Sequence, residues 1–147
     1  MSKQIEEIEN EIVDEFSFFD DWTDKYQYLI ELGQKQNGFP KEKMTEGYRI
    51  KGCMSSVWVV PEFKDGKIYF KSDSDSIIVK GLIALLIRVL SGQTPEEIIN
   101  ARLDFIEKIG LKKHLAQQRT NGLSAMIKQI KMYALAYKLK TEVGKTK

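Results

Sequence analysis

Several features are scarce in this chain of 147 residues, and each scarcity excludes a class of protein. A single cysteine, Cys53, excludes an internal disulfide, a CxxC redox pair and a multi-cysteine zinc or iron–sulfur site. The longest apolar run, residues 81–87, is far shorter than the roughly 18 residues of a membrane span. The first residues also lack the apolar core of a signal peptide. We therefore expect a cytoplasmic protein with no membrane segment.

Neither sign of charge dominates, since 23 lysines and arginines against 21 acids leave a net charge of +2. This balance argues against a general nucleic-acid binder. The charges are nevertheless separated along the chain, with eight acids and one lysine in residues 1–21 and ten basic residues and one acid in residues 108–147. The two ends can therefore attract each other in the fold.

The length fits one domain over residues 1–147, and 42% hydrophobic residues supply its core. We expect residues 1–15 to form an acidic helical extension of this domain. Residues 140–147 are expected to form a frayed basic tail.

Apolar residues at three- and four-residue steps predict a first helix that ends near Phe19. A second helix is predicted to begin at Trp22, after a cap at Asp20 or Asp21, and to end at Gly33 as a left-handed residue. A polar loop follows at residues 34–47.

The pattern then changes to short segments that are rich in β-branched and aromatic residues. Three strands are predicted, at residues 48–50, 57–60 and 67–70, with a hairpin turn at Asp65-Gly66. Because residues 52–55 join the first strand to the second, Cys53 is placed on a tight connection.

Helices return in the second half of the chain. A buried helix is predicted at residues 77–90, capped by the cluster at residues 72–75. Residues 94–97 form a capping box for a short helix at 95–100, one or two further turns follow, and apolar residues at 123–137 define a long final helix. The predicted fold is α+β, a short antiparallel three-stranded sheet with helices on either side of it in sequence.

Cys53 is the residue whose chemistry stands out. A thiol becomes a nucleophile as the thiolate, and a partly exposed, firmly presented thiol is the useful kind. Gly52 permits a positive φ and leaves room for another molecule to approach the sulfur. The alternative, that a lone cysteine is a small core residue, stays open.

The other candidates have structural interpretations. We expect Trp22 and Trp58 to be core or cavity wall. His114 has no second histidine or cysteine with which to bind a metal, so a capping or surface role fits it. Arg119 could bind an anion or an acidic partner, or belong to a solvated face. From the residues alone, the prediction ends at an α+β domain that presents one thiol.

Four blocks of the sequence, in order, resemble the SufE family. They are W-x-x-K-Y-x-x-L-I-x-L-G at residues 22–33, I-x-G-C-x-S-x-V-W at residues 50–58, D-S-D with I-V-K-G-L at residues 73–82, and a closing block at residues 110–126. The sequence differs at Met54, where the family commonly has Gln, and at Tyr48, where many members have Asn.

The resemblance implies a SufE/IscU-like α+β fold and the role of a sulfur acceptor for iron–sulfur cluster assembly. A SufS-type cysteine desulfurase with pyridoxal phosphate would hold sulfur as a persulfide. Cys53 would accept that sulfur, stimulate the desulfurase and pass the sulfur to a downstream iron–sulfur scaffold complex. The chain would then be a monomer or weak homodimer that binds no cofactor, metal or nucleic acid, and a partner of an enzyme rather than an independent one.

The family blocks also suggest roles for individual residues. The resting thiol is expected in an apolar cavity, with Val57, Trp58 and the helix 77–90 as its walls, from which its loop swings out into the desulfurase. Arg119 is the candidate for docking the desulfurase, and the candidates for support of the cysteine loop are Gly52, Ser55, Trp58 and Asp75.

Three alternatives remain beside this interpretation. A CsdE-like member of the same family would relay sulfur toward tRNA modification. A stand-alone thiol-dependent redox enzyme would need an activating histidine or arginine near Cys53. A binding module for nucleic acid or an acidic partner would use the basic C-terminal third. An iron–sulfur scaffold is excluded, because one cysteine cannot supply the ligands of a cluster.

Overall fold

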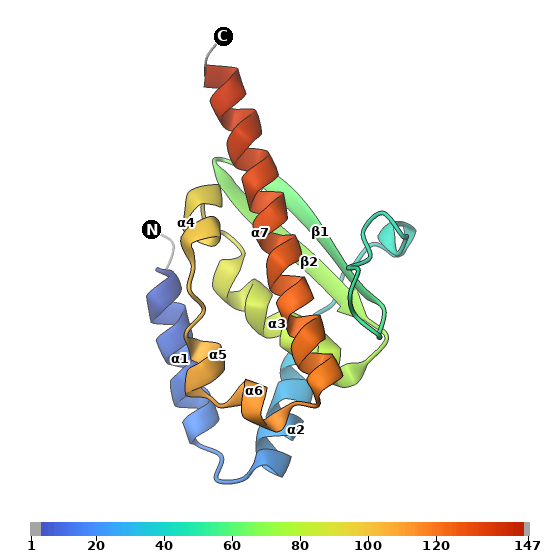
Figure 1. Cartoon of the computed structure of the whole chain (residues 1–147), viewed down its shortest axis with the longest axis vertical. Helices are drawn as coiled ribbons and strands as arrows, with labels where there is room; N and C mark the ends of the chain where they lie inside the picture. Colours follow the sequence, from blue (N-terminus) through green and yellow to red (C-terminus); the bar gives the residue numbers. More distant parts are fainter. Residues whose placement is uncertain (1–3, 146–147) are drawn as a thin grey trace.

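A computed structural model describes residues 4–145, which form an α+β fold with one hairpin and several helices (Figure 1). The helices and strands in chain order are α1 (Ile5–Ser17), α2 (Trp22–Gln34), the 3-10 turn η1 (Lys41–Lys43), β1 (Val57–Lys64), β2 (Lys67–Ser74), α3 (Ile77–Leu90), α4 (Pro95–Asn100), α5 (Phe105–Lys108), α6 (Leu111–His114) and α7 (Gln117–Lys145).

The sheet is a single antiparallel hairpin, in which β1 and β2 pair along their whole length from Val57↔Ser74 to Lys64↔Lys67. Asp65 and Gly66 have φ angles of 52° and 79°, as a tight hairpin turn requires, so that prediction is confirmed. Both strands are longer than predicted, because their hydrogen-bonded pairing continues to the turn. In β2 alternation into the core continues to Ser72, whereas the last three residues of β1 are exposed.

The prediction of a third strand at residues 48–50 is wrong, since the sheet has two strands. The segment makes only an isolated bridge, Arg49↔Trp58. The N–H groups of Tyr48 and Arg49 are taken by turn hydrogen bonds to Thr45 and Glu46, and Gly52 turns the chain away with φ of 95°. Too few extended residues are left between these turns to form a ladder.

The predicted buried helix has the expected bounds and is the centre of the fold as α3. It contacts β2 and the helices α1, α2 and α7 (Figure 1). Its cap is Ser76, whose Oγ accepts a hydrogen bond from the Val79 N–H at 3.3 Å, and not the cluster 72–75, which β2 and the following residue occupy. Strand pairing extends to Ser74, so the helix can begin only after it.

Gly33 has a different role from the one predicted. It lies inside α2, which continues to Gln34. A glycine is needed at this position because α2 crosses α3 here. A Cβ on Gly33 would lie 2.7 Å from the Gly81 nitrogen, and one on Gly81 would lie 2.3 Å from the Leu29 oxygen. The two glycines therefore set how closely the helices approach. The predicted cap of this helix is confirmed at Asp21, which accepts from the Asp24 N–H.

The ends of the chain are helical. α1 buries Ile8, Ile12 and Phe16 in the core, and Arg88 of α3 holds its Glu15 with contacts of 2.7 and 2.5 Å. Residues 1–3 of the expected acidic extension and residues 146–147 of the expected basic tail lie outside the described residues. The division into one domain with these terminal segments stays a prediction.

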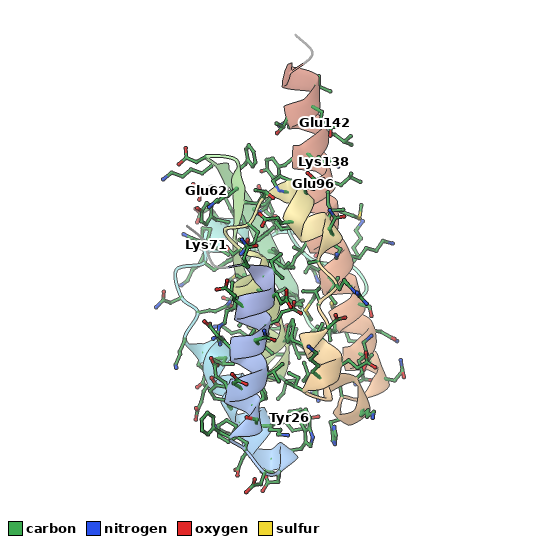
Figure 2. All side chains as sticks on the ribbon, turned by 90° about the vertical axis from the view of Figure 1, so that its left-hand side faces the viewer. Tyr26, Glu62, Lys71, Glu96, Lys138 and Glu142 are labelled. Atoms are coloured by element: carbon green, nitrogen blue, oxygen red, sulfur yellow. The ribbon has the colours of Figure 1, made fainter. Side chains whose placement is uncertain are left out.

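The final helix is longer than predicted, since α7 runs over 29 residues and includes much of the segment expected to fray. Its buried face carries Leu123, Met126, Ile130 and Ala134 against the core. Its last turns, with Glu142, project past the hairpin and α4 (Figures 1 and 2). Within residues 4–145, no helix is both long enough and apolar enough to cross a membrane.

Candidate functional site

Cys53 lies at the tip of a loop whose two ends are held firmly. At the first end, the Ile50 N–H donates to the Val57 oxygen at 2.8 Å. At the second end, the Ser56 N–H donates to Asp75 Oδ1 at 3.0 Å, and the Asp75 N–H donates back to the Ser56 oxygen at 3.2 Å. The tip, residues 51–55, is thus carried on a fixed base.

The tip itself is held more lightly. Its hydrogen bond to the rest of the described chain is the contact from Cys53 Sγ to the Gly122 oxygen of α7, at 3.5 Å. A thiol is a weak donor, so this contact contributes little energy. Gly52 gives the tip its left-handed turn, with φ of 95°. The base is therefore fixed, whereas the tip can leave α7 at small cost.

Gly122 provides the space in which the thiol rests. A Cβ at this position would lie 3.4 Å from Sγ and 3.9 Å from the Cβ of Cys53. An alanine would therefore just touch the thiol, whereas a side chain that extends beyond Cβ would push the loop away from α7. Glycine in the middle of a helix costs about 0.5–1 kcal/mol of stability, and here it allows the sulfur to lie against the helix.

A cavity of about 70 Å³ lies beside the sulfur. The loop contributes Cys53, Met54 and Ser55, α3 contributes Val79, and α7 contributes Gln118, Arg119, Gly122 and Met126. Val79 and Met126 are buried, so the inner wall is apolar, and Arg119 is exposed at the rim. Because a water molecule occupies about 30 Å³, one added sulfur atom fits in this space.

The electrostatic setting keeps the resting thiol protonated. Burial raises the pKa of Cys53 above its usual value, and the positive charge of Arg49 opposes this with a smaller effect. Arg49 is itself paired with Glu46 at 3.3 Å. Since the thiolate is the nucleophile, the thiol is poorly reactive while it lies against α7.

The structure brings some of the predicted site residues together and separates others. Ser55 and Arg119 line the cavity with Cys53, and Asp75 holds the base of the loop. Trp58 lies in β1, where it pairs with Asp73, and is not among the residues that line the cavity. Val57 is buried beneath the loop rather than in the cavity wall, so α3 contributes the wall through Val79.

Three cavity residues, Gln118, Gly122 and Met126, were not predicted as site residues, although Gly122 and Met126 belong to the closing family block. The signal was present, because Arg119, Gly122 and Met126 are spaced by three and four residues and so share a helix face. That face could be recognised only once the start of α7 was known. His114 has a packing role, since its ring stacks on Trp22 with ring centroids 4.1 Å apart.

The donor groups around the cavity are one thiol, one hydroxyl, one amide and one guanidinium. Within the part of the chain that the structure describes, no group of three or more histidine, cysteine, aspartate or glutamate side chains could hold a metal ion. What the arrangement offers is one thiol in a small cavity with an apolar inner wall and a polar rim, on a lightly held loop tip.

Comparison with known proteins identifies the family. Residues 10–134 match the family model of SufE, described as an Fe-S metabolism associated domain. An uncharacterised SufE-like protein of Rhizobium meliloti is 40% identical over 130 residues, which cover 85% of this chain and 93% of that protein. One from Rhizobium etli is 41% identical over 83% of this chain and 86% of its own. One from Synechocystis is 36% identical over 90% and 84%.

A solved structure supports the fold independently. The solution structure of a hypothetical protein from Thermus thermophilus is similar with a TM-score of 0.72 over 88% of this chain and 94% of that chain, at 21% identity. The family model covers most of the chain, including the cysteine loop and its cavity. The chain therefore belongs to the SufE family, which associates it with iron–sulfur metabolism.

Proposed function

We propose that this protein accepts sulfur on Cys53 from the persulfide of a SufS-type cysteine desulfurase, stimulates that enzyme, and passes the sulfur on to iron–sulfur cluster assembly. The observation that carries the proposal is the single thiol at the tip of a loop with a fixed base and a weakly held tip. Membership of the SufE family supplies the metabolic context.

The transfer needs one nucleophile and no change of net oxidation state. The Cys53 thiol loses its proton to solvent, and the thiolate attacks the outer sulfur of the partner's persulfide. The new bond joins Cys53 Sγ to that sulfur, the bond inside the partner's persulfide breaks, and the partner's cysteine leaves as a thiolate. A second cysteine nearby could expel the sulfur as sulfide and close a disulfide, and this chain has none.

The resting geometry favours movement of the loop before this step. Cys53 is only partly exposed and its sulfur faces Gly122, so departure of the tip from α7 opens the sulfur to the partner's persulfide. Leaving the cavity removes the burial that raises the pKa of the thiol. Movement of the tip therefore exposes the sulfur and makes the thiolate easier to form in one event.

The remaining parts of the site have matching roles. Arg119, exposed at the rim of the cavity, is placed to dock the desulfurase where the loop leaves, and Asp75 keeps the base of the loop in register. The pyridoxal phosphate belongs to the desulfurase, and this chain needs no cofactor for the transfer. The downstream acceptor is an iron–sulfur scaffold complex, with a relay to tRNA modification as the alternative within the family.

The test is the turnover of L-cysteine by a SufS-type desulfurase with and without this protein. The wild type should increase turnover, whereas Cys53→Ser should fold and give no increase. Arg119→Ala should need a higher concentration for the same increase. Unchanged turnover with the wild type, together with rapid peroxide consumption by the isolated protein, would instead support a stand-alone thiol enzyme.

A further inference from the structure

We propose that a groove along α7, beginning beside the cysteine loop, binds an extended acidic segment of a protein partner. The groove lies on the Gly52 side of the loop, whereas the cavity with Arg119 lies on the other side. The inference rests on the proposed function and deepens it, because it gives the sulfur carrier a second docking surface beside the cysteine loop.

The first part of the groove lies between the cysteine loop and α7. It is a cavity of about 610 Å³ whose lining includes Gly52 of the loop and Ala125 of the helix. A Cβ on Gly52 would lie 3.2 Å from the Cβ of Ala125, so the loop and the helix are in close contact here. An occupant of this cavity therefore touches the residue next to Cys53.

The second part continues along α7 toward β1. It is a cavity of about 510 Å³ with three tyrosines in its lining, Tyr48, Tyr133 and Tyr137, beside the apolar Val60 and Pro61. The tyrosines are half-buried, and one face of the Tyr137 ring is stacked on Phe63 with centroids 5.0 Å apart, so each ring offers a ligand only part of its surface. Tyr133 is fixed by a hydrogen bond from its hydroxyl to the Val59 oxygen at 3.4 Å.

The two cavities join on the surface of α7. Gln129 and Met132 line the first, and Tyr133 and Ala136 line the second. Residues four apart are neighbours on a helix, so the pairs 129/133 and 132/136 make the surface continuous. The groove runs along helix residues 125–140, and at about 1.5 Å of helix rise per residue its length is about 22 Å. An extended peptide of about seven residues spans that length.

The charge of the groove selects an acidic occupant. Its lining holds one acid, Glu46, which is paired with Arg49 at 3.3 Å. The basic residues in the lining of the two cavities are Lys43, Arg49, Lys51, Lys128 and Lys140. Lys43 lies over the Tyr48 ring, 5.8 Å from its centroid, which combines charge with an aromatic surface.

These features favour a protein segment over nucleic acid. The whole chain has a net charge of only +2, and the exposed acids of α1 would repel a long polyanion. The apolar side chains of Val60 and Pro61 in the lining cannot hydrogen-bond to a phosphate backbone. A segment in which acidic residues alternate with aromatic or leucine residues can pair its carboxylates with the lysines and pack its apolar side chains against the tyrosines.

The test uses the full chain and a synthetic eight-residue peptide of alternating glutamate or aspartate with phenylalanine. Amide NMR signals of residues 43–52 and 125–140 should shift on titration. The variant Lys43→Glu/Lys128→Glu/Lys140→Glu should bind the peptide about tenfold more weakly or worse. A matched control, Lys64→Glu/Lys71→Glu/Lys112→Glu, changes three exposed lysines outside the groove and should bind within about twofold of the wild type.

Any of three results would refute peptide binding at the groove. They are no chemical-shift changes at millimolar peptide, equal weakening of peptide binding in both triple variants, or tighter binding of an eight-residue oligothymidylate than of the peptide. The proposed function is measured separately, as sulfur loading of Cys53 by the desulfurase. Normal loading with no peptide binding refutes the groove alone. Peptide binding at the groove with no loading refutes the sulfur-acceptor function alone.

Discussion

Replacement of Asp75 by alanine tests how the cysteine loop is held. Asp75 Oδ1 accepts the Ser56 N–H at 3.0 Å, and this bond fixes the second end of the loop. The Asp75 N–H and the Ser74 hydroxyl both still donate to the Ser56 oxygen after the change. The variant therefore loses one charge-assisted hydrogen bond from a base that otherwise remains.

The expected cost follows from that one bond. Hydrogen bonds to charged groups contribute about 1.5–3 kcal/mol, and exposure of Asp75 to solvent lowers the value here to about 1 kcal/mol. If this bond forms only while the tip is seated, its loss makes the tip leave the cavity about fivefold more often. Cys53 should then react with iodoacetamide about fivefold faster at neutral pH, because labelling follows the population of the open form.

The matched control is Asp73→Ala, two residues earlier in β2. Asp73 pairs with Lys80 at 3.3 Å and does not contact the loop. This variant should label at the wild-type rate even if its stability falls by a similar amount. Equal labelling rates for the wild type, Asp75→Ala and Asp73→Ala would refute the claim that the Asp75 bond controls exposure of the thiol.

Three further predictions follow from the same geometry. Gly122→Ala should raise stability to urea by up to about 1 kcal/mol through helix propensity with little change in the labelling of Cys53, because its Cβ would lie in ordinary contact with Sγ. Gly122→Leu, whose side chain extends beyond Cβ, should speed the labelling, and slower labelling in that variant would contradict the described contact of the thiol with α7. Arg49→Gln should move the pH midpoint of Cys53 alkylation upward, because the charge that lowers the pKa is lost, whereas Arg102→Gln should leave it unchanged. Arg88 holds the pKa of Glu15 below its usual 4.5, so this contribution to stability is present above that pH and is lost as the pH falls through the lower folded value. Urea unfolding at pH 7 and pH 3 should therefore show a smaller acid loss in Glu15→Gln than in the wild type.

Regular patterns made much of the fold predictable. Continuous apolar character gave α3 its bounds, and the capping box at Thr94 and Glu97 is present with both of its hydrogen bonds. Such features depend on neighbours within four residues, so a local pattern contains the information. The hairpin turn at Asp65-Gly66 belongs to the same class.

Features that depend on distant contacts were not predictable. Gly33 has the local pattern of a helix end, yet glycine is required there because the backbone of Gly81 in the neighbouring helix lies too close for a Cβ. The segment 48–50 has strand-like residues, but turns on both sides leave it with a single bridge. In both cases the deciding contact is made by a residue far away or by a competing local hydrogen bond.

The same distinction applies to the site. The position of Cys53 on a tight loop could be predicted from Gly52 and from the neighbouring strand-like segments, whereas the position of Arg119 in the lining of the same cavity could not. The contact between Sγ and Gly122 joins residues 69 apart, so nothing in the local sequence of either could predict it. Trp58 resembles a cavity residue by its position in the block, but strand pairing with Asp73 directs it elsewhere.

The most direct test of the central claim is intact-protein mass spectrometry after mixing with a SufS-type desulfurase, pyridoxal phosphate and L-cysteine, without reductant. The account predicts a gain of one or more sulfur atoms that maps to Cys53, disappears on reduction and is absent in Cys53→Ser. A desulfurase that is active on L-cysteine but leaves the mass of this protein unchanged would contradict it.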